Sequence, residues 1–226
     1  MDTRTLLTDL KSMVSPAHTA ILVIDMQNDF CADTGNTGRV LGKDVRACQA
    51  IVDPIRRLVA SARLAGAMVI WIKADYDPVY LSSPVLAKLK SKGVTEPYAV
   101  SGTWGADFYE VAPESGDIIV EKHRHSAFTG TELDIILRDR NIRTLVFAGV
   151  QTHVCIETTF RDGFTRGYYI VVPADCVGSF AEDLHAATLK CVRQHFGEVS
   201  TCSEIEAIWA AYPQLQHTHA TSESAR

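Results

Sequence analysis

The chain has 226 residues, 46% of them hydrophobic and 22% charged, with a formal net charge of −5. These values are typical of one globular domain built around a single large core. The basic residues are scattered, and no apolar run reaches the roughly 20 residues of a membrane-spanning helix, so neither nucleic acid nor membrane is an expected partner. No signal-peptide pattern opens the chain, so we expect a cytoplasmic protein. Six cysteines are too sparse for a disulfide scaffold, which predicts reduced thiols.

Short apolar runs predict strands that are buried on both faces. Residues 19–25 read TAILVID and residues 67–73 read AMVIWIK, and each run ends in a charged residue. Further strands are predicted at residues 118–120, 144–148 and 169–172. Helical periodicity predicts helices over residues 45–62, with Pro54 at a start or kink, and over residues 132–139, 155–166 and 182–195.

The alternation of strands and helices predicts an α/β fold. We expect a doubly wound, Rossmann-like, mostly parallel sheet between two helical layers, giving a three-layer αβα architecture. Residues 1–213 form a single predicted domain, and the polar tail at residues 214–226 is predicted to be disordered. Residues 75–116 are rich in Pro, Gly, Ser and aromatic residues, as in a long excursion that could cover a site.

Three chemically capable side chains lie at the carboxyl ends of predicted strands, where such sheets bind ligands. Cys155 opens a helix just after a strand, where the helix dipole favours a thiolate. Asp25 ends a buried strand, where a carboxylate needs a cation or a role as a base. Lys122 ends another strand and could hold Asp25 and depress the thiol pKa. Taken singly, these residues also fit a buried thiol, a turn-capping acid and a solvated lysine; their shared edge favours a catalytic set.

Three ordered motifs resemble those of the isochorismatase-like cysteine hydrolases. They read ILVIDMQNDF at residues 21–30, VEKHRHSAF at residues 120–128 and GVQTHVCIETTFRDGFTRGY at residues 149–168. The likeness extends from about residue 19 to about residue 209. It implies that Asp25 is the general base and acid, Lys122 the positioning cation and Cys155 the nucleophile.

The resemblance also implies details of the reaction. It places a cis peptide bond between Val150 and Gln151, with the backbone N–H groups of Gln151 and Cys155 as the oxyanion hole. The thiolate of Cys155 would attack an amide or ureido carbonyl, and water activated by Asp25 would hydrolyse the acyl-enzyme. No metal or other cofactor is required. A homo-oligomer is implied, often a tetramer whose neighbouring subunits lend residues to the pocket.

Within this family, the sequence fits some members better than others. Nicotinamidases carry an Asp and two His that bind a metal after the second strand, but that region here reads WIKADYDPVYLSSP. Isochorismatases proper generally lack the nucleophilic cysteine. The segment SGTWGADF at residues 101–108, together with the second and third motifs, looks most like the ureidoacrylate amidohydrolases and their relatives acting on biuret and triuret. We therefore expect a small ureido or carbamoyl substrate.

Aromatic walls with a few convergent polar groups would suit such a planar substrate. The candidate substrate-binding residues are Asn28, Phe30, Trp104, His125, Phe128 and Gln151. Each aromatic side chain could instead belong to the core, and His125 could be an exposed histidine. His153 departs from the Asn or Asp that is commoner at its position, which leaves a pairing with Cys155 open. Three other functions also stay open: an amidase for another small amide, a silent binding or scaffold protein on the same fold, and a thiol redox protein that uses Cys155 with Cys176.

Overall fold

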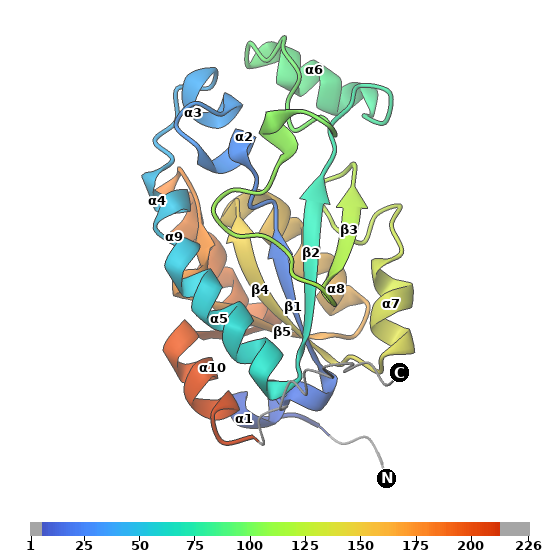
Figure 1. Cartoon of the computed structure of the whole chain (residues 1–226), viewed down its shortest axis with the longest axis vertical. Helices are drawn as coiled ribbons and strands as arrows, with labels where there is room; N and C mark the ends of the chain where they lie inside the picture. Colours follow the sequence, from blue (N-terminus) through green and yellow to red (C-terminus); the bar gives the residue numbers. More distant parts are fainter. Residues whose placement is uncertain (1–5, 213–226) are drawn as a thin grey trace, which may run out of the picture.

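A computed structural model describes residues 6–212, and a single parallel sheet forms its centre (Figure 1). The strand order is β3-β2-β1-β4-β5-β7, with the short β6 paired to β4, and every pairing is parallel. The strands are β1 (Thr19–Ile24), β2 (Met68–Ala74), β3 (Ile118–Lys122), β4 (Thr144–Val150), β5 (Tyr169–Pro173), β6 (Val177–Gly178) and β7 (Gly197–Ser200). The predicted doubly wound α/β fold is confirmed.

Helices cover both faces of the sheet. One face carries α5 (Val52–Ala65) and α10 (Cys202–Trp209), and the other carries α7 (Leu133–Asp139), α8 (Glu157–Thr165) and α9 (Glu182–Cys191). The remaining helical segments are short. They are α1 (Leu10–Met13), α2 (Asn28–Cys31), α3 (Asn36–Arg39), α4 (Arg46–Gln49), α6 (Ser83–Ser91), η1 (Pro16–His18), η2 (Trp104–Ala106), η3 (Thr152–Ile156), η4 (Ala174–Cys176) and η5 (Val192–Phe196).

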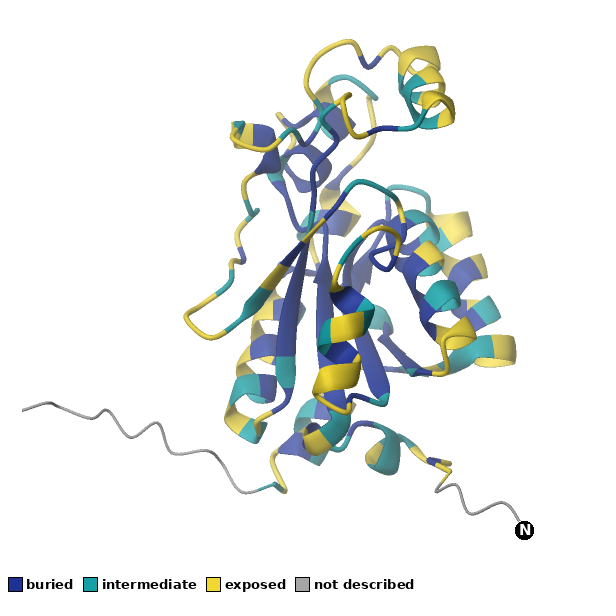
Figure 2. Cartoon of the chain, turned by 90° about the vertical axis from the view of Figure 1, so that its right-hand side faces the viewer, coloured by how far each residue is buried: buried dark blue, intermediate teal, exposed yellow. Residues whose placement is uncertain are grey.

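The core lies on both faces of the central strands. All six residues of β1 are buried, and alternate side chains point to opposite faces. Ile21 and Val23 join the cluster under α5 and α10, whereas Leu22 and Ile24 join the cluster under α7 and α8. Figure 2 shows the result: buried strands in the middle and helices whose outer faces are exposed. Burial on both faces explains why the strand sequences are continuous apolar runs.

The sequence-based boundaries match the structure in most of the chain. The predicted helix at residues 45–62 is split into α4 and α5, and Pro54 lies in the first turn of α5, where its missing N–H costs no hydrogen bond. The predicted excursion at residues 75–116 contains α6 and η2. The predicted disordered tail lies outside the described residues. No helix in the described part of the chain is long and apolar enough to cross a membrane.

Candidate active site

The strand order gathers the three predicted catalytic residues at one edge of the sheet. Strands β3, β2, β1 and β4 are consecutive neighbours, and their carboxyl ends point toward α2, α3 and α6 (Figure 1). Gly149 lets β4 approach β1 closely, because a Cβ at this position would lie 2.0 Å from the carbonyl oxygen of Ile24. The chain after β4 therefore runs directly beside Asp25, which follows Ile24.

Lys122 connects the other two side chains. Its Nζ lies 2.9 Å from Oδ2 of Asp25 and 3.5 Å from Sγ of Cys155. The Lys122 side chain is 0% exposed and that of Asp25 is 1% exposed, so the ion pair is removed from solvent. Besides this ion pair, the Asp25 carboxylate interacts with the Cys155 thiol, and that hydrogen bond contributes to the raised pKa of the thiol. The carboxylate thus keeps the capacity to accept a proton.

The protonation states follow from burial and from these three charges. Burial, followed by the negative charge of Asp25, raises the pKa of the Cys155 thiol to about 12, although Lys122 partly offsets the rise. Burial alone would lower the pKa of Lys122, but Asp25 and Cys155 outweigh it, and the pKa is raised. Burial and the Asp25 charge therefore oppose the thiolate that the helix start favours. These effects favour a neutral thiol beside the Asp25–Lys122 ion pair.

Two further polar groups surround the sulfur. The Tyr76 hydroxyl lies 3.8 Å from Sγ of Cys155 and 3.3 Å from Nδ1 of His125, and that nitrogen lies 3.9 Å from the same sulfur. Burial raises the pKa of Tyr76 well above its usual range, so its hydroxyl keeps the proton. Burial, followed by the charge of Lys122, lowers the pKa of His125, which favours the neutral imidazole. Both groups can exchange hydrogen bonds with a neutral polar substrate.

A cavity of about 120 Å³ opens onto Cys155. Of the predicted substrate-binding residues, Phe30, His125 and Gln151 line it. Its other lining residues are Asp25, Leu41, Tyr76, Val85, Leu89, Lys92, Tyr98, Val150, Val154, Cys155 and Phe180. The cavity is small and mixes apolar walls with polar groups near the sulfur, as a site for a small planar molecule requires.

The other three candidates lie away from this cavity. The ring of Phe128 stacks on Tyr168 in the core, with centroids 5.9 Å apart. The side chain of Trp104 is 53% exposed at the start of η2, and Asn28 Nδ2 donates to the Trp104 carbonyl at 2.8 Å. In this structure Asn28 and Trp104 fix the excursion to α2 and do not contribute to the cavity wall.

The turn between β4 and η3 shapes the predicted oxyanion hole. The peptide bond between Val150 and Gln151 is cis, as the family resemblance implied. The Gln151 side chain is held from behind: Oε1 accepts from the backbone N–H of Phe180 at 3.2 Å, and Nε2 lies 3.4 Å from Sγ of Cys48. Cys48 is fully buried. The position of Gln151 therefore depends on a cysteine of α4 that no sequence motif indicated.

Two alternatives that the sequence left open do not fit the geometry. His153 does not pair with Cys155, because its Nδ1 lies 2.9 Å from the Ser179 hydroxyl and its ring packs edge-on against Phe180. Cys176 does not lie beside Cys155 either, and its thiol contacts that of Cys202. A redox pair of Cys155 with Cys176 is thus not formed.

One group of residues near the site could hold a metal ion. Asp75, Glu121 and His123 each offer a ligand atom, and these atoms all lie within 4.8 Å of one another. The Asp75 carboxylate already accepts the backbone N–H groups of Asp77 and Ser101 at 3.1 and 3.0 Å. Nδ1 of His123 lies 2.8 Å from the Asp75 carbonyl oxygen. These contacts account for part of the cluster without an ion.

The excursion is fixed over the cavity by a buried acid that sequence reasoning missed. Asp29 in α2 accepts hydrogen bonds from the backbone N–H of Asn36 at 2.9 Å, from Asn36 Nδ2 at 2.9 Å and from the backbone N–H of Ala99 at 2.7 Å. Tyr76 and Tyr98, which line the cavity, were missed as well. In the sequence, only the position of Asp29 within the NDF segment of the first motif could have indicated its importance.

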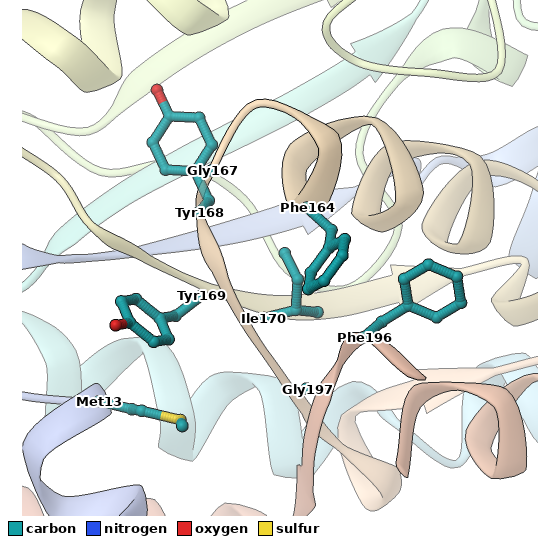
Figure 3. A pocket seen from close by; sticks show the side chains of 8 residues that line it. All are labelled: Met13, Phe164, Gly167, Tyr168, Tyr169, Ile170, Phe196 and Gly197. Atoms are coloured by element: carbon teal, nitrogen blue, oxygen red, sulfur yellow. The ribbon is translucent and has the colours of Figure 1, made fainter. Parts of the chain in front are cut away.

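Another cavity, of about 260 Å³, is lined by the residues labelled in Figure 3 and lies at the opposite end of the sheet. Tyr169, which begins β5, pairs with Thr144 at the beginning of β4, whereas Cys155 follows the far end of that strand. The lining includes no acid, cation or thiol. It consists of Met13, Phe164, Gly167, Tyr168, Tyr169, Ile170, Phe196 and Gly197.

Comparisons with known proteins identify the family of the chain. The isochorismatase domain family matches residues 19–204. The chain is 36% identical over 203 residues to the ureidoacrylate amidohydrolase RutB of Methylorubrum extorquens, covering 84% of this chain and 82% of that protein. It is also 36% identical over 204 residues to RutB of an Enterobacter species, covering 84% of this chain and 88% of that protein.

Solved structures lead to the same family. A cysteine hydrolase from Pseudomonas syringae pv. phaseolicola superposes with a TM-score of 0.78 at 29% identity, covering 92% of this chain and 99% of that one. An N-carbamoylsarcosine amidase from Thermoplasma acidophilum superposes with a TM-score of 0.67 at 27% identity, covering 81% of this chain and 96% of that one. The chain therefore belongs to the isochorismatase domain family and is a hydrolase, as its three motifs predicted.

Proposed function

We propose that the protein is a cysteine-dependent amidohydrolase that cleaves a C–N bond of a small ureido or carbamoyl compound, of the ureidoacrylate, biuret or triuret type. The observation that carries the proposal is the buried contact of Lys122 with both Asp25 and Cys155, at the floor of a small cavity. The names of the relatives, ureidoacrylate amidohydrolase and N-carbamoylsarcosine amidase, support the substrate class.

The first half-reaction acylates the enzyme. The Cys155 thiol gives its proton to Asp25 while its sulfur attacks the carbonyl carbon of the substrate. Negative charge then moves from the carboxylate to the sulfur and on to the carbonyl oxygen. Lys122 lies within 3.5 Å of both the carboxylate and the sulfur, so its charge stabilises the site before and after the proton moves. This explains how a thiol of raised pKa can act as a nucleophile.

The second half-reaction returns the enzyme to its starting state. Asp25 donates its proton to the departing nitrogen, the C–N bond breaks, and a thioester remains on Cys155. A water molecule then attacks the acyl carbon as Asp25 takes its proton. The C–S bond breaks, and the proton returns to the sulfur. In this scheme the backbone N–H groups of Gln151 and Cys155 stabilise the oxyanion in both halves.

The experiment measures ammonia release by the wild-type protein and by Cys155→Ser on ureidoacrylate, biuret, triuret, N-carbamoyl amino acids and nicotinamide. Cys191→Ser is the matched control, because Cys191 is another free cysteine and does not line the cavity. We expect turnover of a ureido compound that Cys155→Ser abolishes and Cys191→Ser preserves. If Cys155→Ser retained activity, Cys155 would not be the nucleophile. If the wild type hydrolysed none of the compounds, the result would favour the scaffold protein.

A further inference from the structure

Lys92 is a cation at the mouth of the Cys155 cavity that the catalytic scheme does not use. It comes directly after α6, and its side chain lines the cavity together with Leu89 of that helix. Unlike Lys122, it is exposed. It lies in the excursion and belongs to none of the three family motifs.

The protein does not neutralise the charge of Lys92. No carboxylate among residues 6–212 forms an ion pair with it, and Glu96, four residues further on, is already paired with Arg39 at 2.6 Å. Within the cavity, the charge of Asp25 is compensated by Lys122 at 2.9 Å. Asp25 and Lys122 cancel, so the positive charge of Lys92 remains, in a chain whose formal net charge is −5.

This charge acts on a group deep in the site. Burial and then Lys122 lower the pKa of His125, and Lys92 lowers it further. An ammonium group that acts on a histidine beside the Cys155 sulfur will also attract an anion bound in the same cavity.

Several residues that line the cavity together with Cys155 and Lys92 are apolar. Leu41, Leu89, Val154 and Phe180 are among them. Such a wall suits a short hydrocarbon segment better than a second urea group, whose N–H and carbonyl groups would lose their hydrogen bonds to water. The cavity therefore combines polar groups beside the nucleophile, apolar lining residues and one exposed cation, Lys92.

We propose that Lys92 binds a carboxylate of the substrate, so that short ureido carboxylic acids are preferred over uncharged ureas such as biuret. The ureido carbonyl would lie at Cys155, the carbon chain along the apolar wall and the carboxylate at the mouth. This inference rests on the proposed function, because it assumes a ureido group at the nucleophile. It makes Lys92 a specificity-determining residue and gives it no part in the chemical steps.

The test compares steady-state kinetics on 3-ureidopropionate and on biuret for the wild type, Lys92→Met and Lys88→Met. Lys88 is an exposed lysine of the same helix that does not line the cavity, so it controls for the change in net charge. We expect Lys92→Met to raise KM for 3-ureidopropionate about tenfold or more, with little change in kcat, and to leave biuret kinetics unchanged. Lys88→Met should resemble the wild type on both compounds.

Two outcomes would overturn the proposal: equal effects of Lys92→Met on both compounds, or no effect on 3-ureidopropionate. If the wild type hydrolyses neither compound, the proposed function fails. The proposed carboxylate site at Lys92 is then tested by measuring ligand binding. Calorimetry then compares the binding of 3-ureidopropionate to Cys155→Ala and to Cys155→Ala/Lys92→Met. Weaker binding to the double variant supports the site, whereas equal binding, or no binding to either, refutes it.

Discussion

Replacing Lys122 by methionine should strongly destabilise the fold, because it leaves the Asp25 carboxylate buried without its cation. The two side chains are 0% and 1% exposed and their charged atoms lie 2.9 Å apart. The Cys155 thiol also contacts Asp25, but it carries no positive charge that could replace the lost cation. Removing one member of a buried ion pair typically costs about 3–5 kcal/mol. For a chain of this size, that loss corresponds to a Tm lower by roughly 6–20 °C.

Urea unfolding at pH 7, followed by circular dichroism, measures the loss. The double variant Asp25→Asn/Lys122→Met should recover most of it, because neither buried charge remains. Lys73→Met is the control: Lys73 is a partly exposed lysine of β2, and its replacement should change the free energy of unfolding by at most about 0.5 kcal/mol. A loss below about 1 kcal/mol for Lys122→Met, or no recovery in the double variant, would show that the pair is not desolvated and would refute the reasoning.

Three further predictions follow from the same site. The pKa of Lys122 is raised in the folded protein, so its contribution to stability should be complete below its unfolded pKa of about 10.4. This contribution should be lost as the pH rises through the folded pKa. The loss of stability at alkaline pH should therefore be less steep in Lys122→Met than in the wild type. Asp25→Asn should abolish amide hydrolysis yet shift the pH midpoint of Cys155 alkylation downward, because the Asp25 charge helps to raise the thiol pKa; an unchanged midpoint would contradict this. Cys48→Ala should lower kcat roughly tenfold by releasing the Gln151 side chain, whereas Cys31→Ala, which removes another buried thiol, should not.

That the three candidate catalytic residues lie together could be predicted from the sequence, because the rule that ligands bind at the carboxyl ends of parallel strands needs no distances. Asp25, Lys122 and Cys155 each end or follow a strand, and parallel strands bring such positions together. The resting state of the thiol could not be predicted in this way. A helix start favours a thiolate, but burial and the nearby Asp25 charge outweigh it, and neither quantity can be read from local sequence.

The residues that line the cavity around Cys155 were harder to predict than Asp25, Lys122 and Cys155 themselves. Phe30 and Phe128 are each the last residue of a family motif, yet Phe30 lines the cavity and Phe128 packs on Tyr168. Lys92 and α6 lie in a stretch of weak periodicity, which is tied to the distant Asp29 by a hydrogen bond from the backbone N–H of Ala99. Strand β7 was missed because its four residues, GEVS, are too few and too polar for an apolar run.

The most direct measurement of the central claim is intact-mass spectrometry of the protein, acid-quenched during turnover of ureidoacrylate and followed by peptide mapping. Cys155 as nucleophile predicts a transient mass increase equal to one acyl group derived from the substrate, located on the peptide that contains Cys155 and absent from Cys155→Ser. Turnover with no adduct at any quench time, or an adduct on a different residue, would contradict a covalent mechanism at Cys155.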